Sequence, residues 1–135
     1  MKLPFLFVTA IALMDADRRV LLAQRPEGKS MAGLWEFPGG KVDSGETPED
    51  ALVREIKEEL NVDIRAEDLL PLTFASHAYE AFHLFMPLFL CRTWRGDLCP
   101  MEGQKIEWVF PADFNGYAMP AADVPLAAFL RKFCL

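Results

Sequence analysis

The chain has few of the residues that build cysteine-based or basic functional sites. It contains three cysteines, Cys91, Cys99 and Cys134, and no C-x-x-C pair. We therefore expect neither a disulfide framework nor a thiolate zinc site, and a reducing cytoplasm is the simplest setting. Acidic residues outnumber basic ones, 20 Asp and Glu against 14 Lys and Arg, for a formal net charge of −6. Because holding a duplex takes clustered Lys and Arg, we expect no stable binding to duplex nucleic acid.

The sequence also lacks an apolar run long enough to cross a bilayer. Residues 3–14 are mostly apolar and follow Lys2, a pattern that also suits a short signal peptide. A polar turn at 15–19 leads directly into a second apolar run at 20–23. Two β-rich runs around a polar turn favour a β-hairpin. We therefore expect a strand here and no association with a membrane.

The composition predicts one folded domain. Hydrophobic residues make up 52% of the 135 residues, which excludes a disordered or low-complexity chain. There is no repeat, linker or charge block, so we expect a single domain over residues 1–135. Patterning predicts helices at about 48–60 and 123–133, and strands at about 4–14, 18–25, 35–37, 62–65, 70–76, 81–94 and 107–110. Pro87 predicts a bulge or an edge position for its strand. This order predicts an α+β fold, an α/β/α sandwich with a mixed central β-sheet.

The internal helix has clear end signals. Thr47 is a good N-cap, Pro48 suits the first helical position, and Asp50 stands three residues after the cap. Asn61 can adopt the left-handed conformation that ends a helix. The pattern therefore predicts a helix that begins after Thr47 and ends at Asn61.

Acidic residues gather on one side of this helix. At about 100° per residue, one arc of the helix is apolar, and it contains Leu52, Val53, Ile56 and Leu60. Glu55, Glu58 and Glu59 share a neighbouring arc, where like charges repel. A solvated acidic face is the ordinary interpretation, but Arg54 and the glycine-rich loop that enters the helix favour a site for a divalent cation. With no His or Cys set nearby, Mg²⁺ or Mn²⁺ suits this site better than Zn²⁺.

From Gly40 the chain has five residues, Glu46, seven residues, and then Arg54-Glu55-Ile56-Lys57-Glu58-Glu59-Leu60-Asn61-Val62. This resembles the Nudix box, G-x5-E-x7-R-E-U-x-E-E-x-G-U with U apolar, and only the final Gly differs, as Asn61. Segments 24–25, 34–41, 102–104 and 120–123 resemble the MutT branch of that family, which hydrolyses oxidised guanine nucleotides. The resemblance covers nearly the whole chain.

The resemblance implies a Mg²⁺-dependent pyrophosphohydrolase, with Mn²⁺ able to substitute. Such an enzyme would convert 8-oxo-dGTP to the monophosphate and pyrophosphate, which cleanses the nucleotide pool for DNA replication. The resemblance further implies a set of metal ligands, namely the Gly39 carbonyl, Glu55, Glu58, Glu59 and Glu102. Arg54 would orient Glu55, and Glu46 would contribute from outside the ligand set. We expect Glu55 to be the general base, with Glu102 as the second candidate.

Substrate binding is predicted at four positions: Arg25, Phe37, Lys41 and Asp123. Arg25 and Phe37 would lie at the base, although Phe37 also suits simple core packing. Lys41 would meet a phosphate oxygen or remain an ordinary surface lysine. Asp123 stands where the family usually has an Asn that contacts the purine edge. His77 and His83 have no recognisable partners, and we expect structural roles for both.

Two other hypotheses remain open at this stage. The same chemistry could act on CTP, a nucleotide sugar or a dinucleotide, and the residues beyond the box, Arg25, Phe37 and Asp123, would decide between them. A non-catalytic Nudix-fold nucleotide sensor would be expected to lose box carboxylates, and all three helix glutamates are present here. We expect a monomer that acts on small-molecule nucleotides.

Overall fold

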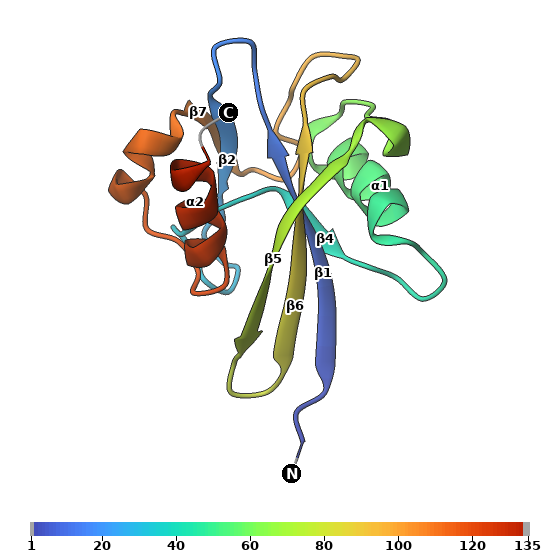
Figure 1. Cartoon of the computed structure of the whole chain (residues 1–135), viewed down its shortest axis with the longest axis vertical. Helices are drawn as coiled ribbons and strands as arrows, with labels where there is room; N and C mark the ends of the chain where they lie inside the picture. Colours follow the sequence, from blue (N-terminus) through green and yellow to red (C-terminus); the bar gives the residue numbers. More distant parts are fainter. Residues whose placement is uncertain (1, 134–135) are drawn as a thin grey trace.

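The computed structural model describes residues 2–133, which form two β-sheets flanked by two helices (Figure 1). The larger sheet has the strand order β4-β1-β6-β5, from Gly39–Lys41, Phe5–Leu13, His83–Cys91 and Leu70–Ala78. It is mixed, because β1 runs parallel to β6 while β4 and β5 run antiparallel to their neighbours. The smaller antiparallel sheet has the order β3-β2-β7, from Trp35–Glu36, Val20–Gln24 and Lys105–Val109. The helices are α1 (Pro48–Leu60) and α2 (Asp123–Lys132), and the 3-10 turns are η1 (Ala66–Asp68) and η2 (Pro111–Gly116).

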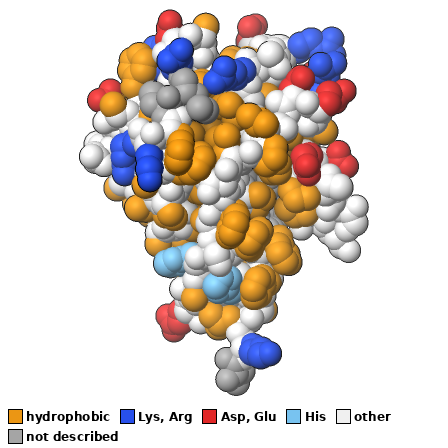
Figure 2. All heavy atoms as spheres, in the orientation of Figure 1, with side chains coloured by type: hydrophobic (Ala, Val, Ile, Leu, Met, Phe, Trp, Pro, Cys, Tyr) orange, Lys and Arg blue, Asp and Glu red, His pale blue; other side chains and the backbone are white. Residues whose placement is uncertain are grey.

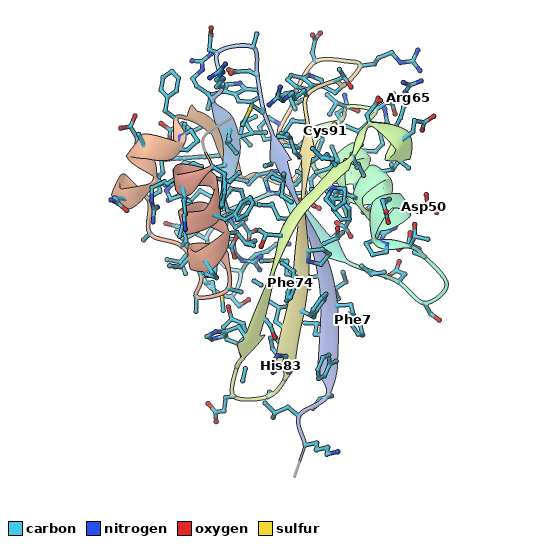
Figure 3. All side chains as sticks on the ribbon, viewed as in Figure 1. Phe7, Asp50, Arg65, Phe74, His83 and Cys91 are labelled. Atoms are coloured by element: carbon cyan, nitrogen blue, oxygen red, sulfur yellow. The ribbon has the colours of Figure 1, made fainter. Side chains whose placement is uncertain are left out.

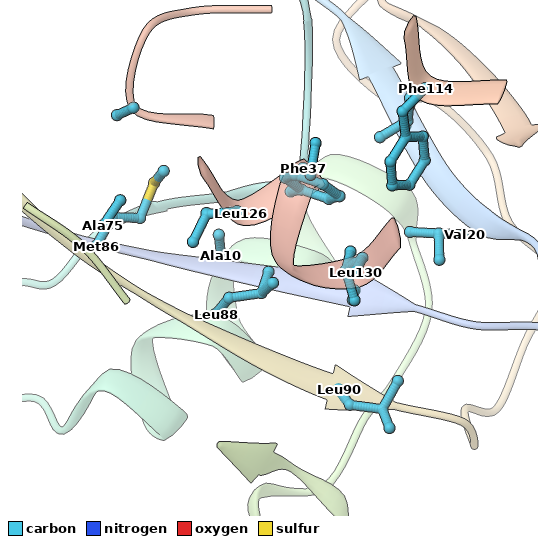
Figure 4. Packing of buried hydrophobic residues seen from close by; sticks show 14 of the residues in the cluster. Ala10, Val20, Phe37, Ala75, Met86, Leu88, Leu90, Phe114, Leu126 and Leu130 are labelled. Carbon is cyan, nitrogen blue, oxygen red and sulfur yellow. The ribbon is translucent and has the colours of Figure 1, made fainter. Parts of the chain in front are cut away.

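The two faces of β1 contribute to two different hydrophobic cores. Ala10 and Ala12 pack in the core that contains Leu126 and Leu130 of α2 (Figure 4). Ile11 and Leu13 face the other way, into the core that contains Leu52, Ile56 and Leu60 of α1. In Figure 1 the two helices accordingly lie on opposite sides of the sheet. The predicted α/β/α sandwich with a mixed sheet is confirmed.

The predicted ends of α1 are confirmed. The Thr47 hydroxyl oxygen accepts a hydrogen bond from the Asp50 N–H at 3.1 Å, and Pro48 is the first helical residue. Asn61 has φ 61° and ψ 27°, the left-handed conformation, and its N–H donates to the Lys57 carbonyl. The helix therefore presents its acidic residues in a fixed orientation relative to the sheet beneath it.

The predicted hairpin at the N-terminus is wrong. β1 and β2 belong to different sheets, and only an isolated bridge between Met14 and Val20 joins them. The polar turn exists, since the Asp15 N–H donates to the Arg19 carbonyl at 3.0 Å. Each strand instead pairs along its length with partners that lie far away in the sequence, β1 with β6 and β2 with β7. Those pairings bury both faces of β1 at residues 9–13 and both faces of β2 at residues 20–23, which a two-stranded hairpin could not do.

Three further strand predictions need correction. Residues 62–65 form no strand, because only Asp63 pairs there, in an isolated bridge with Arg95. Conversely, the glycines expected to end a strand form β4, in which Gly40 pairs with Thr9 of β1. Pro87 lies in β6, an interior strand, and the irregularity in the β5–β6 ladder lies elsewhere, in β5. The register of β6 with β1 contains no pair at Pro87, which has no N–H to donate.

The lower half of the large sheet carries exposed aromatic side chains. Phe5, Phe7 and Phe74 are more than half exposed. The Phe74 ring stacks on Phe85 at 4.9 Å, and Phe5 stacks on His83 at the same distance. Figure 3 places Phe7, Phe74 and His83 where β1, β5 and β6 extend past the helices, and Figure 2 shows hydrophobic side chains gathered on that part of the surface. Within residues 2–133, no helix is long and apolar enough to cross a membrane.

Candidate active site

A cleft of about 140 Å³ lies where α1 meets the smaller sheet, and four acidic side chains line it beside Arg25 and Lys29. We call it the carboxylate cleft, after its lining residues Glu36, Glu55, Glu59 and Glu102. They come from β3, from α1 and from the segment before β7. Four carboxyl groups around so small a space repel one another unless protons or cations neutralise them.

Glu59 is the most strongly perturbed of these groups. Burial is the main cause that raises the pKa of its carboxyl group to about 9, together with contact with Glu55 and a smaller contribution from Glu102. The Glu59 Oε2 atom is buried and has no hydrogen-bond partner among residues 2–133. A buried carboxylate oxygen without a partner is costly, and a bound cation would remove that cost.

Arg54 ties the acidic helix to the loop before it. Its guanidinium donates two hydrogen bonds to the Glu46 carboxylate, at 2.8 and 2.9 Å, and one to Glu55 at 2.9 Å. A further hydrogen bond reaches the Lys41 carbonyl at 3.1 Å. Arg54 and the Asp43 N–H hold the pKa of Glu46 at about 2, far below its usual value. Arg54 therefore fixes where the Glu55 carboxylate lies.

The two glycines of β4 leave space that the site requires. A Cβ atom on Gly40 would overlap the Glu55 carboxylate, and one on Gly39 would overlap the backbone carbonyl of Thr9. Gly40 is therefore needed because Glu55 lies directly against the strand. Gly39 is needed because β1 lies against it, and Gly39 also lines the carboxylate cleft.

Glu102 reaches the cleft on a segment that is bonded to the end of α1. The Gln104 side chain donates to the Glu59 carbonyl at 2.9 Å and accepts from the Glu102 N–H at 2.8 Å. The Met101 N–H donates to the same Glu59 carbonyl at 2.9 Å. Glu58, by contrast, does not line the cleft, and its side chain is 55% exposed.

The donor set suits a hard divalent cation, although the acidic side chains do not converge as a finished site. Among residues 2–133, no group of three or more His, Cys, Asp or Glu side chains is arranged to hold a metal ion. What the cleft brings together is Glu55 in contact with Glu59, with Glu102 on the same wall. The unpartnered oxygen of Glu59 and its raised pKa fit a cation that is held by oxygen donors.

A second cavity of about 330 Å³ adjoins the carboxylate cleft. We call it the aromatic cavity, because Phe37, Tyr79 and Phe82 line it together with apolar side chains of β1 and β6. Arg25, Glu36 and Gly39 line both spaces, so the two share a wall. The four predicted substrate-binding residues all line the aromatic cavity: Arg25, Phe37, Lys41 and Asp123.

Asp123 is the first residue of α2 and is 5% exposed. Its Oδ2 atom accepts a hydrogen bond from the Phe37 N–H at 3.1 Å. The pKa of Asp123 is raised to about 7, mainly by burial and also by the nearby charge of Glu36, against the lowering effect of the Phe37 hydrogen bond. Near neutral pH this carboxyl group is therefore close to its midpoint, and it can accept or donate a proton.

Other predicted residues have more than one role in the structure. Phe37 is buried and packs edge-on against Phe114, so it belongs to the core as well as to the cavity wall. The Arg25 guanidinium donates to the Ser30 carbonyl at 2.7 Å and pairs with Glu36 at 3.3 Å. Arg25 therefore also holds the loop between β2 and β3.

The sequence interpretation missed three residues of this site: Glu36, Tyr79 and Met31. Glu36 stands between Trp35 and Phe37 beside the glycines, and that position was a usable signal. Burial raises its pKa above the usual value. The Tyr79 hydroxyl accepts from the Ala122 N–H at 3.1 Å, at the start of α2, and no local pattern marks that contact.

Known proteins match both this geometry and the sequence. The NUDIX domain profile matches residues 9–128. The chain belongs to the Nudix family. An 8-oxo-dGTP diphosphatase of Proteus vulgaris is 38% identical over 98 residues, which cover 73% of this chain and 86% of that protein. A CTP pyrophosphohydrolase of Escherichia coli is 37% identical over 117 residues, covering 85% and 84% respectively.

Solved Nudix-fold structures are similar along nearly the whole chain. MutT, in a study of the Aliivibrio salmonicida and Vibrio cholerae proteins, superimposes with a TM-score of 0.79 at 29% identity, covering 96% of this chain and 99% of that one. The solution structure of the E. coli ORF135 protein superimposes with a TM-score of 0.84, also at 29% identity, covering 98% and 92%. The predicted membership of the Nudix family and its MutT-like branch is thereby confirmed.

Proposed function

We propose that residues 1–135 act as a single Nudix hydrolase domain that converts oxidised guanine nucleoside triphosphates, with 8-oxo-dGTP foremost, to the monophosphate and pyrophosphate. The observation that carries this proposal is that the carboxylate cleft and the aromatic cavity lie side by side and share Arg25, Glu36 and Gly39. A nucleotide can place its base in the cavity and its phosphates in the cleft. The similar 8-oxo-dGTP diphosphatases of P. vulgaris and E. coli, at 38% and 30% identity, favour this substrate class.

In this mechanism the acidic residues hold Mg²⁺, with Mn²⁺ able to substitute. When bound, the ion neutralises phosphate charge and makes water easier to deprotonate. Glu55, Glu59, Glu102 and the Gly39 carbonyl would hold it from the cleft, and Glu58 would join after a side-chain rotation. The Glu58 side chain is 55% exposed, and rotation toward the cleft would break its 3.6 Å ion pair with Arg54.

The remaining residues position the reacting groups. Glu55 takes the proton of the attacking water, and Arg54 orients Glu55 through their 2.9 Å hydrogen bond. Glu46 holds the other side of the Arg54 guanidinium and acts only through it. Lys41 meets a phosphate oxygen of a nucleotide that enters through the aromatic cavity.

Asp123 suits the edge of an oxidised guanine. Oxidation at C8 replaces the N7 acceptor by an N7–H donor, while O6 remains an acceptor. An ionised Asp123 accepts from N7–H and repels the N7 lone pair of undamaged guanine, whereas a protonated Asp123 can donate to O6. A pKa near 7 makes both forms available at neutral pH. The buried carboxyl group of Asp123 therefore discriminates between damaged and undamaged guanine.

The test is steady-state hydrolysis of 8-oxo-dGTP and dGTP with Mg²⁺, monitored by pyrophosphate release. We expect kcat/KM to favour 8-oxo-dGTP, and chelation of the metal to abolish turnover. Asp123→Ala should reduce the ratio between the two substrates at least tenfold, about 1.4 kcal/mol. Equal kcat/KM for both nucleotides in the wild-type protein would contradict the substrate proposal.

CTP is the second candidate, because the 37% identical E. coli relative is a CTP pyrophosphohydrolase. A CTP arm in the same assay decides between them, and higher kcat/KM for CTP than for 8-oxo-dGTP would favour this alternative. Nucleotide sugars and dinucleotides belong in the same panel. We further propose a cytoplasmic protein that works as a monomer, which equilibrium sedimentation would test.

A further inference from the structure

The loop between β2 and β3 uses a methionine where a glycine would be less strained. Three residues in this loop have positive φ: Gly28 at 87°, Met31 at 59° and Gly33 at 85°. Glycine adopts this conformation without a steric penalty, whereas the Cβ atom of any other residue is crowded there. The loop therefore has the expected residue at two positions and a strained one at the third.

The Met31 side chain lies at the wall of the aromatic cavity. Met31 lines that cavity together with Phe37 and Asp123. Its side chain is nevertheless 45% exposed, so the protein core does not fully cover it. The strain thus serves to hold a flexible apolar side chain at the rim of the cavity, not to fill the interior. Persistent strain of this kind is found mainly where function depends on the residue.

The surrounding loop keeps Met31 in this position. The Arg25 side chain donates to the Ser30 carbonyl at 2.7 Å, immediately before Met31. After it, the Leu34 N–H donates to the Met31 carbonyl at 3.2 Å, and the Gly33 N–H donates to the Arg25 carbonyl at 2.9 Å. Both sides of the strained residue are therefore bonded to Arg25 or to the start of β3.

We infer that Met31 is a specificity-determining residue that packs its thioether against the flat heterocycle of the bound nucleotide base. A thioether is polarisable and adapts its rotamers, and contact with an aromatic ring is favourable for it. Asp123 lies on the same cavity and offers only polar contacts at the edge of the base. Met31 supplies apolar contact to its face. This inference rests on the proposed function.

The test compares three substitutions of Met31. Met31→Gly removes both the side chain and the strain, so the thermal midpoint should stay unchanged or rise while KM for 8-oxo-dGTP rises about tenfold. The effect should fall on KM more than on kcat, because Met31 touches the base and not the reacting phosphate. Met31→Ala should raise KM equally while keeping the strain. Met31→Leu should restore most of the affinity, because its length and apolar character are similar.

Arg18 provides a matched control. It is also a non-glycine residue in the left-handed region, with φ 67°, but it lies in the turn between β1 and β2 and lines neither cavity. Arg18→Gly should therefore change the thermal midpoint in the same direction as Met31→Gly and leave KM unaltered. A rise in KM in Met31→Gly without one in Arg18→Gly separates contact with the base from relief of strain.

Two results would overturn the inference. One is an unchanged KM in both Met31→Gly and Met31→Ala, and the other is a loss confined to kcat. Calorimetric titration with 8-oxo-dGMP and with CMP separates this inference from the proposed reaction. If the wild-type protein binds a monophosphate without hydrolysing 8-oxo-dGTP, the proposed function fails, and the inference stands only if Met31→Gly weakens that binding. A wild-type protein that binds neither monophosphate refutes both.

Discussion

Gly40→Ala should separate catalysis from folding. The new Cβ atom would overlap the Glu55 carboxylate, which is the far end of a flexible side chain and can move away. Gly40 itself does not have positive φ, so alanine can adopt its backbone conformation. The substitution should therefore displace the proposed general base and leave the sheet intact.

The expected stability change is the sum of two opposing contributions. Replacing glycine by alanine at a compatible position stabilises a protein by about 0.4–1 kcal/mol, through the unfolded chain. Moving the Glu55 carboxylate weakens its bond to Arg54, a partly exposed pair worth up to about 1 kcal/mol. The free energy of unfolding should therefore change by less than about 1 kcal/mol. A carboxylate displaced by about 1 Å should lower kcat about 100-fold.

The assay pairs urea denaturation with pyrophosphate release under saturating 8-oxo-dGTP and Mg²⁺. Gly39→Ala is the contrasting variant, because its Cβ atom would overlap the Thr9 backbone of β1, which cannot rotate away. It should lower the free energy of unfolding by about 1–3 kcal/mol or more. Wild-type turnover in a folded Gly40→Ala protein would refute the assignment of Glu55 to the reaction.

Three further predictions concern single residues. The pKa of Asp123 is near 7 in the folded protein and 3.8 ordinarily, so the free energy of unfolding of the wild-type protein should fall between about pH 4 and 7. In urea melts, the stability advantage of Asp123→Asn over wild type should therefore grow across that pH window and level off above it. Without metal at pH 8, Glu59→Gln should melt at a higher temperature than wild type, because burial disfavours the ionised Glu59 carboxylate. Added Mg²⁺ should raise the thermal midpoint of wild type only, and a rise in both proteins would argue against Glu59 as a metal ligand. Because Asn61 is in the left-handed conformation, Asn61→Val should lower the free energy of unfolding by about 1–2 kcal/mol, whereas Asn61→Gly should leave it almost unchanged. An unchanged denaturant midpoint for Asn61→Val would contradict a helix end at this residue.

Local signals predicted α1 well because each of them acts within a few residues. Thr47, Pro48 and Asn61 specify the two helix ends through contacts with near neighbours in the sequence. The spacing of Glu55 and Glu59 places both carboxylates on one side of the helix whatever the helix packs against. For the same reason the acidic cluster could be recognised without any knowledge of the sheet.

Pairing over long distances could not be predicted in this way. The predicted turn at 15–19 is correct, yet β1 pairs with β6 and β2 pairs with β7. These distant pairings bury strand faces that pairing between the two neighbouring strands alone would leave exposed. Glu58 has the right spacing for the acidic arc, but its side chain is 55% exposed, pairs with Arg54 at 3.6 Å and does not line the cleft. Met31 has no sequence signal at all, since nothing in its neighbours requires positive φ there.

The bonds between the end of α1 and the segment before β7 have a consequence for the order of assembly. The Glu59 carbonyl receives the Met101 N–H and the Gln104 amide, and the Leu60 carbonyl receives the Cys99 N–H at 2.9 Å. The last turn of the helix thus uses a loop segment that is distant in the sequence as its cap, and that segment carries Glu102. Fraying of the helix end and departure of Glu102 are then a single opening event. Hydrogen exchange at the Met101 amide should report directly on how often the carboxylate cleft comes apart in the native protein.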